Sequence, residues 1–315
     1  DRSGAQRLTR TYHYAAGLAW SAAGDEVWFT ASVMGERKKL RAVTLAGRER
    51  VVYGDTGALV LHDVARDGRV LLAREDFRRR IFFRDVGSGE AREVSWQDRP
   101  RLFDLTADGR RFAFWESGEG ASRGATRFYL RETSGEAPVR LETGGRGLIF
   151  SPDGRWVVTT TSGSEAATAH VYPVEGGRVR TVELRGFRTC LAGLMPDAKG
   201  LWVGDVTEGR PQRTWLLAGE SSPARPVTPE GVAARYPWVT RDGTAVVGSS
   251  GPSLALYPVA GGEPVPLLGV GAGERLAGWG PSADSVYAHD PTDIPTNVYR
   301  VDVENGDSSK VYRVG

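Results

Sequence analysis

The sequence predicts an all-β fold, a single β-propeller of seven four-stranded blades, on three observations. First, an apolar strand ends in an Asp-Gly turn and a second apolar strand follows at once, most clearly at Ser151-Pro152-Asp153-Gly154-Arg155 before Trp156. Second, copies of this segment lie roughly 41 to 46 residues apart, a period that is typical of propeller blades when the repeat is made of short strands. Third, capped stretches with helical periodicity are nearly absent.

Each repeat contains four predicted strands. Further copies of the Asp-Gly turn lie at 65–69, 106–110 and 240–244, with weaker copies at 22–25, 196–200 and 281–284. A second series of tight turns alternates with them, at 46–47, 88–89, 134–135, 176–177, 219–220, 261–262 and 305–306. Its glycines supply the positive φ that two-residue hairpin turns require. The pattern from one Asp-Gly turn to the next is therefore four antiparallel strands, which make one blade.

The two strands around each Asp-Gly turn can be placed. We predict the innermost strands at Gly17–Trp20, Val60–Val64, Leu102–Leu105, Leu148–Phe150, Cys190–Leu194, Pro237–Val239 and Leu276–Trp279. The second strands follow at Glu26–Thr30, Val70–Ala73, Arg111–Trp115, Trp156–Thr160, Leu201–Gly204, Ala245–Gly248 and Ser285–Ala288. Since blade faces stack on one another, we expect the tryptophans in or beside these strands to fill the interblade core: Trp20, Trp28, Trp115, Trp156, Trp202, Trp238 and Trp279.

One domain spanning 1–315 is predicted, with blades at about 17–57, 58–98, 99–144, 145–186, 187–231, 232–269 and 270–315. Residues 1–16 are expected to supply a strand of a neighbouring or closing blade. Both Ala5–Arg10 and Ser309–Val314 have the pattern of an outermost strand, which is one more than seven blades need. Either one strand is displaced, or the first belongs to a blade outside this chain. The start at Asp1-Arg2-Ser3-Gly4 also indicates a fragment of a longer protein.

The composition excludes some classes of function. The 41 basic and 39 acidic residues give a formal charge of +2, so the whole chain has no electrostatic drive toward nucleic acid or a membrane surface. No apolar run is long enough to span a bilayer. The single cysteine, Cys190, cannot form an intrachain disulfide, and its place on an apolar strand predicts a buried side chain. These observations leave the compartment open.

Longer phrases carry a family resemblance. They are 17–21 with 26–30, 61–69, 148–156, 229–232 and 255–259. Together they resemble the C-terminal propeller of bacterial eukaryotic-like serine/threonine protein kinases, which is built of TolB-like (PD40, WD40-like) repeats. The repeat motif itself is shared with TolB and with the propellers of prolyl-oligopeptidase-type peptidases. The resemblance covers essentially the whole chain.

The resemblance implies a non-catalytic sensor or protein-interaction domain of a receptor-like kinase. In that family the kinase comes first and a membrane helix usually follows, so the repeats are expected on the periplasmic side of a membrane-anchored protein. A cytoplasmic location stays open. The kinase motifs are absent from this chain: Asp76-Phe77-Arg78 is not Asp-Phe-Gly, and His62-Asp63 lacks the intervening arginine.

No catalytic or metal constellation is predicted. Gly120-Ala121-Ser122-Arg123-Gly124 matches the serine-hydrolase pattern, but it lies in a long polar loop and no helix follows it. The four histidines have no short ligand spacing, and no loop carries the alternating carboxylates of a calcium site. We therefore expect no cofactor and no metal.

The loops that join second to third strands and the loops leading into the innermost strands are expected on one face. Arginine and tyrosine gathered there would suit a protein or peptide partner, or an anionic small ligand, and no stacking platform for nucleic acid is visible. The candidate binding residues are Arg37, Lys38, Lys39, Arg78, Arg79, Arg80, Arg101, Tyr12, His13, Tyr14, His62, Arg188 and Tyr236. The alternative for the basic loops is solvated charge, partly paired with Glu36, Glu75 and Asp76.

Two other functions stay open. The chain could be the substrate-gating propeller of a prolyl-oligopeptidase-type peptidase, which predicts an α/β-hydrolase domain downstream. It could also be a propeller hydrolase or lyase with its site at the central channel, where His62, Asp63, Asp104 and Arg101 would be the candidate residues.

Overall fold

A computed structural model describes most of the chain: residues 6–33, 37–76, 78–85, 90–97, 99–116, 127–141, 145–219, 222–271, 273–280 and 284–314. Over these residues the regular structure is all strand, and no helix is present that could cross a membrane. The chain divides into two compact units: unit 1 comprises residues 1–101 and 115–127, and unit 2 comprises 102–114 and 128–315. Each unit is described by itself.

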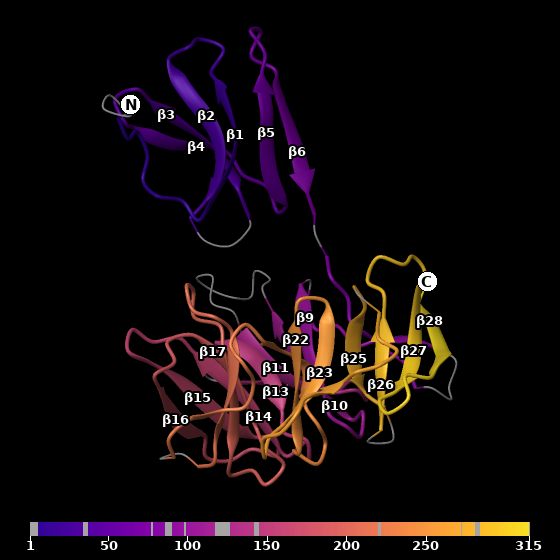
Figure 1. Cartoon of the computed structure of the whole chain (residues 1–315). Helices are drawn as coiled ribbons and strands as arrows, with labels where there is room; N and C mark the ends of the chain where they lie inside the picture. The colour runs from indigo at the N-terminus through magenta and orange to yellow at the C-terminus, as the bar shows by residue number, and fades with distance from the viewer. Residues whose placement is uncertain are drawn as a thin grey trace. The chain divides into compact units, whose positions relative to one another are not determined.

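Unit 1 contains the first two sets of four strands, and Figure 1 labels every strand of the first set. One four-stranded sheet runs in chain order through β1 (Tyr14–Trp20), β2 (Glu26–Ser32), β3 (Lys39–Thr44) and β4 (Glu49–Tyr53). The second set forms two antiparallel pairs, β5 (Ala58–Val64) with β6 (Val70–Glu75) and β7 (Phe82–Phe83) with β8 (Arg92–Glu93).

Five more four-stranded sheets follow, each in chain order. The third set is β9 (Pro100–Leu105), β10 (Arg111–Glu116), β11 (Arg127–Glu132) and β12 (Val139–Arg140), and the fourth is β13 (Arg146–Phe150), β14 (Trp156–Thr161), β15 (Ala166–Pro173) and β16 (Arg180–Arg185). The fifth is β17 (Cys190–Leu194), β18 (Leu201–Asp205), β19 (Arg213–Leu217) and β20 (Arg225–Pro226), and the sixth is β21 (Ala233–Val239), β22 (Ala245–Ser250), β23 (Ser253–Pro258) and β24 (Val265–Pro266). The seventh is β25 (Arg275–Trp279), β26 (Ser285–His289), β27 (Thr296–Asp302) and β28 (Ser308–Val314).

Seven successive sets of four antiparallel strands are the strand plan of a seven-bladed propeller, and the predicted fold class is confirmed. We number the sets as blades 1 to 7. All fourteen predicted first and second strands are present, and thirteen of them are one to four residues longer than predicted. The extension of one domain over residues 1–315 stays a prediction.

The N-terminal segment differs from its prediction. The described residues 6–13 contain no strand, so the outermost strand expected over Ala5–Arg10 is wrong for residues 6–10. Side chains hold this segment instead of a ladder: the Arg10 amide donates to Glu49 Oε1 (3.0 Å), and Arg7 Nε donates to the Thr9 carbonyl (2.9 Å). Blade 7 takes its outermost strand, β28, from the chain end as predicted.

The Asp-Gly turns share one hydrogen-bonding pattern. In blade 4 the Ser151 hydroxyl donates to Asp153, whose carboxylate also accepts from the Arg155 amide (3.1 Å), and the Trp156 amide donates back to Ser151 Oγ (3.0 Å). The Gly154 amide closes the turn onto the Ser151 carbonyl (2.8 Å). A hydroxyl and a carboxylate thus satisfy the main-chain donors where two strands reverse direction.

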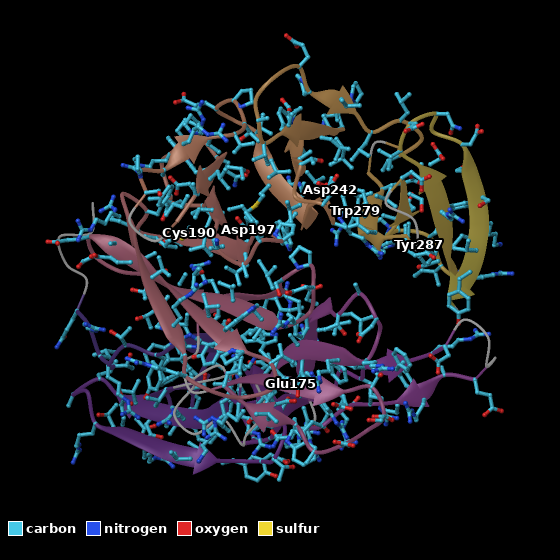
Figure 2. All side chains as sticks on the ribbon, turned by 90° about the horizontal axis from the view of Figure 1, so that it is seen from below. Glu175, Cys190, Asp197, Asp242, Trp279 and Tyr287 are labelled. Carbon is cyan, nitrogen blue, oxygen red and sulfur yellow. The ribbon has the colours of Figure 1, made fainter. Side chains whose placement is uncertain are left out.

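The same pattern in other blades lowers carboxylate pKa values. Asp108 accepts from the Thr106 hydroxyl (2.6 Å) and from the Arg110 amide (3.0 Å), and these bonds, the hydroxyl's first, lower the pKa of Asp108. The Thr240 hydroxyl likewise lowers the pKa of Asp242. At the Asp197 turn the Gly200 and Lys199 amides lower the carboxyl pKa instead. Asp197 and Asp242 are labelled in Figure 2.

The core of unit 2 lies between neighbouring blades. One cluster joins Val158 and Leu184 of blade 4 to Cys190 and Val203 of blade 5, and others join blades 5 and 6 and blades 6 and 7. Cys190 is 1% exposed, as predicted, and burial raises the pKa of its thiol to about 12, with a smaller contribution from Asp205.

The tryptophan prediction holds in part. Trp202 is 1% exposed and stacks on Trp238 (ring centroids 5.4 Å apart), and Trp156 and Trp279 pack against the interblade clusters. Trp28 and Trp115 are half-buried. Trp20 does not follow the prediction, because its side chain on β1 is 55% exposed.

The position that glycine occupies in the Asp-Gly turns leads to a first prediction. Ala198 has a φ of 56° at the position that Gly154 and Gly109 occupy in other blades, with φ of 68° and 69°. A left-handed backbone conformation costs a residue with a Cβ about 1–2 kcal/mol. Replacing that residue by glycine removes this cost, but the greater conformational entropy of glycine in the unfolded chain offsets part of the gain. We expect Ala198→Gly to stabilise the protein by about 0.5–1 kcal/mol in urea unfolding.

The matched control is Gly109→Ala, where a Cβ would meet no atom within 4 Å. It should destabilise by about 1 kcal/mol through backbone strain alone. Equal stability of wild type and Ala198→Gly would contradict the assignment of Ala198 to the position that glycine occupies in these turns.

A second prediction concerns how stability depends on pH. Because the folded pKa of Asp108 is lowered, its stabilisation is present above the unfolded value of about 3.9 and is lost as the pH falls through the folded value. Asp108→Asn should cost about 0.5 kcal/mol at pH 7, allowing for solvent screening, and progressively less as the pH is lowered below the unfolded value. Urea unfolding at pH 7 and in a series of acidic buffers measures this. Glu208→Gln, at an exposed position, is the control and should leave the free energy of unfolding unchanged at neutral and at acid pH. An equal cost of Asp108→Asn at neutral and at acid pH would refute the charge argument.

A third prediction uses the buried thiol. With a pKa of about 12, only about one Cys190 thiol in 10⁴ is ionised at pH 8. The native protein should therefore not react with a disulfide reagent within minutes, whereas guanidinium-unfolded protein should react as an ordinary thiol. Fast labelling of the native protein would show that Cys190 is accessible.

Candidate functional site

Several predicted binding loops meet at one end of unit 1. Tyr14 of β1 pairs with Ser32 at the end of β2, and the His13 amide donates to the Ser32 carbonyl (3.0 Å). Ala58 at the start of β5 pairs with Glu75 at the end of β6. The Leu59 amide donates to the Lys38 carbonyl (3.1 Å), which joins the two blades. We call these strand ends with their adjoining residues, 12–14, 37–39, 55–59 and 74–76, the loop end of unit 1, and residues 78–80 follow it in the chain.

Charge at the loop end is mixed. Lys38 Nζ lies 3.3 Å from Glu75 Oε2, so part of the basic charge is neutralised, as the solvated-charge alternative expected. Arg80 pairs with Glu93 (3.1 Å). Lys39 and Arg78 are exposed, as are Arg79 and Arg80, and Arg37 is half-buried. Glu36 lies outside the described residues.

An ion-pair network of three residues that the sequence did not reveal connects two segments of this end. Arg74 lies 3.6 Å from Asp55 Oδ1 and 3.2 Å from Asp76 Oδ2, so it bridges the loop before β5 and the end of β6. The Thr56 hydroxyl and amide donate to Asp55 and lower its pKa. The available signal was the Asp-Thr-Gly sequence at 55–57, typical of a turn in which the aspartate accepts main-chain bonds.

The aromatic candidates differ in exposure. Tyr12 is half-buried, its hydroxyl bonds to Glu49, its ring meets Phe29 edge-on (5.6 Å), and the Arg41 guanidinium lies over it (5.0 Å). Its side chain is thus committed to packing inside unit 1. His13 and Tyr14 are exposed and meet edge-on, with centroids 4.6 Å apart.

The central-channel candidates are divided between the two units, His62, Asp63 and Arg101 in unit 1 and Asp104 in unit 2. His62 is exposed on β5 at a register shift between Leu61 and Asp63, which is a β-bulge. Asp63 accepts from the Val64 amide (2.8 Å). Asp104, in unit 2, accepts from the Phe150 amide (2.8 Å) and so links blades 3 and 4. Both carboxylates therefore have main-chain partners.

The remaining candidates lie on blades 3, 4, 5 and 6 or in the segments between them. Arg101 is exposed on β9, and Arg188 is exposed in unit 2, where its carbonyl accepts from Gly163 (3.1 Å). Tyr236 lies on β21, and its side chain is outside the described part. Ser122 and its loop also lie outside it. Among the described residues no group of three or more His, Cys, Asp or Glu side chains could hold a metal ion.

Comparison with solved structures finds the same class of fold. A puromycin-hydrolysing peptidase of Mycobacterium tuberculosis is 17% identical, with a TM-score of 0.50 over 98% of this chain and 57% of its own. One of two prolyl endopeptidases analysed for inter-domain dynamics is 17% identical, with a TM-score of 0.48 over 95% and 49%. A putative TolB from Agrobacterium tumefaciens is 14% identical, with a TM-score of 0.44 over 84% of each chain.

At these identities the similarity concerns the fold alone, and the chain spans about half the length of the two peptidases. No protein-family model and no curated protein sequence matches it. The chain is therefore similar in fold to about half of the Mycobacterium tuberculosis peptidase.

Proposed function

We propose that this propeller is a non-catalytic module that binds a protein or peptide partner through the loop end of unit 1. The observation that carries the proposal is the convergence there of exposed, chemically varied side chains at strand ends, those of His13, Tyr14 and Lys39; the basic segment 78–80 follows β6 in the chain. Loops placed by a rigid scaffold are where propellers and other β folds concentrate recognition.

The mixed charge favours a protein partner over an anionic small ligand. Arg74 and Lys38 are held by Asp55, Asp76 and Glu75, so no concentrated positive pocket forms around them. The exposed Lys39 and Arg78 offer separate contacts at the rim. Such rim charges steer a complementary protein and fix its register more than they add affinity.

The longer sequence phrases support a finer proposal, that this propeller is the partner-binding domain of a receptor-like serine/threonine kinase and lies on the periplasmic side of a membrane. Binding at the loop end would then alter the proximity or orientation of kinase domains elsewhere in the full protein. The gating propeller of a peptidase stays the alternative, and the two differ in what the full gene encodes: a kinase before the propeller or an α/β-hydrolase domain after it.

The test is capture from an envelope extract by the immobilised chain. We expect wild type to retain a specific protein, and Lys39→Glu with Arg78→Glu to weaken its capture by roughly tenfold, since each reversal replaces an attraction with a repulsion. Arg155→Glu with Arg178→Glu changes the net charge equally at exposed sites in unit 2 and should retain the partner. Quantitative mass spectrometry measures the retained protein. Equal loss in both double variants, or no specific capture by wild type, would overturn the proposal.

A further inference from the structure

The outermost strand of blade 4 has an open edge. Four of the seven outermost strands, β8, β12, β20 and β24, are only two residues long, and short edge strands limit pairing with other chains. β16 is six residues long and ends the sheet order β13-β14-β15-β16. Among the described strands only β15 pairs with it.

The register shows which main-chain groups of β16 face that open edge. The Ala167 amide of β15 points toward the β16 side, because it donates to the Phe187 carbonyl just beyond β16. Ala167 pairs with Leu184 and Ala169 with Val182. Since the main-chain groups of alternate residues point to opposite edges of a strand, Thr181, Glu183 and Arg185 direct their amides and carbonyls to the open edge.

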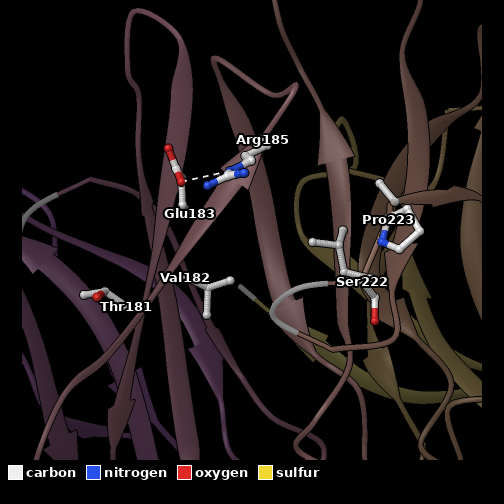
Figure 3. A pocket seen from close by; sticks show the side chains of 8 residues that line it. Thr181, Val182, Glu183, Arg185, Ser222 and Pro223 are labelled. Carbon is white, nitrogen blue, oxygen red and sulfur yellow. Dashed lines mark hydrogen bonds and ion pairs between the residues drawn. The ribbon is translucent and has the colours of Figure 1, made fainter.

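A groove of about 510 Å³ lies beside this edge, toward blade 5 (Figure 3). Val182 of β16 and Pro223 of the loop between β19 and β20 lie on opposite sides of it. Its lining also includes Thr181, Glu183 and Arg185 of β16 and, from blade 5, Leu217, Ser222 and Ala224. A strand added to β16 would direct the side chains opposite Val182 and Leu184 to the blade 5 face, and therefore into this groove.

The other side of the added strand would meet charge. Glu183 and Arg185 are both exposed on that face, and their side chains form an ion pair (3.1 Å). In an antiparallel addition the residue opposite Arg185 is complemented best by an acid, and the residue opposite Glu183 by a base.

A second copy of β16 does not fit the groove. Its Val182 and Leu184 are 2% and 0% exposed, because they are already packed in their own interblade core, and they could not fill a second cavity. We propose that the β16 edge is a strand-addition site for an extended peptide segment of another protein. That segment carries apolar side chains at alternate positions, with an acid and a base between them opposite Arg185 and Glu183.

This site lies in unit 2 and stands independently of the loop end proposed above. A capped peptide with the central sequence Glu-Val-Lys-Val-Thr, running antiparallel to β16, tests it by fluorescence anisotropy. Wild type should bind it saturably below about 1 mM. Lys39→Glu with Arg78→Glu should leave this binding unchanged, so failure of one proposal is distinguishable from failure of the other.

The decisive variant is Glu183→Pro, matched with Glu183→Ala. Proline removes an amide that faces the open edge while leaving the β15 ladder intact. Glu183→Pro should weaken binding roughly tenfold beyond Glu183→Ala, the equivalent of one lost hydrogen bond. A peptide with proline in place of the lysine should bind to the wild-type protein as weakly as the original peptide binds to Glu183→Pro. Equal affinity of the two protein variants, or no saturable binding by wild type, would overturn the proposal.

A charge exchange covers the case in which Glu183→Pro does not fold. Glu183→Lys with Arg185→Glu keeps the ion pair but reverses its direction, so it should bind Lys-Val-Glu-Val-Thr in preference to Glu-Val-Lys-Val-Thr. An unchanged preference would refute strand addition in the proposed register.

Discussion

The turn between the first and second strand of each blade is the constraint on which the rest of the fold depends. In blade 4 the Ser151 hydroxyl and the Asp153 carboxylate bond to the turn amides, and Gly154 supplies the left-handed backbone. The turn fixes the pairing register of the two strands, and a slip by one residue would send every side chain to the wrong face. The local hydroxyl–carboxylate pair therefore decides which side chains reach the space between blades.

The interblade core follows from that register. Both faces of a middle blade are covered, so all five residues of β18 are buried rather than alternating with exposed ones. Close packing then requires small residues beside large ones. A Cβ at Gly193 would lie 2.6 Å from Trp202 Nε1, so the indole occupies space that only glycine leaves open. Trp279 adds a directional link, since its Nε1 donates to the Val239 carbonyl of blade 6 (2.8 Å).

Local signals predicted the strands and turns because both are set by neighbouring residues: alternating apolar positions and a turn motif. The segment at residues 6–10 failed for the opposite reason. It was predicted as a strand because it follows the turn sequence Ser3-Gly4, but the Arg10 amide donates to Glu49, thirty-nine residues away. The candidate site likewise has one feature that the sequence predicted and one that it did not. Topology predicted that the loops of blades 1 and 2 meet, whereas the bridging of Asp55 and Asp76 by Arg74 depends on side-chain contacts without periodicity.

The groove beside β16 illustrates why the repeat pattern of the sequence does not predict where a repeat fold has a distinct surface. Every blade repeats the same four strands, so the repeat pattern gives each outermost strand the same expected role. The differences arise where the repeat is irregular: β16 is long where β12 and β20 are short, and the loop carrying Pro223 forms a wall opposite Val182. An open main-chain edge supplies affinity for any extended chain, and the adjoining side chains supply selectivity. In this propeller the repeated elements provide stability, and the strand addition that we propose depends on the departures from the repeat.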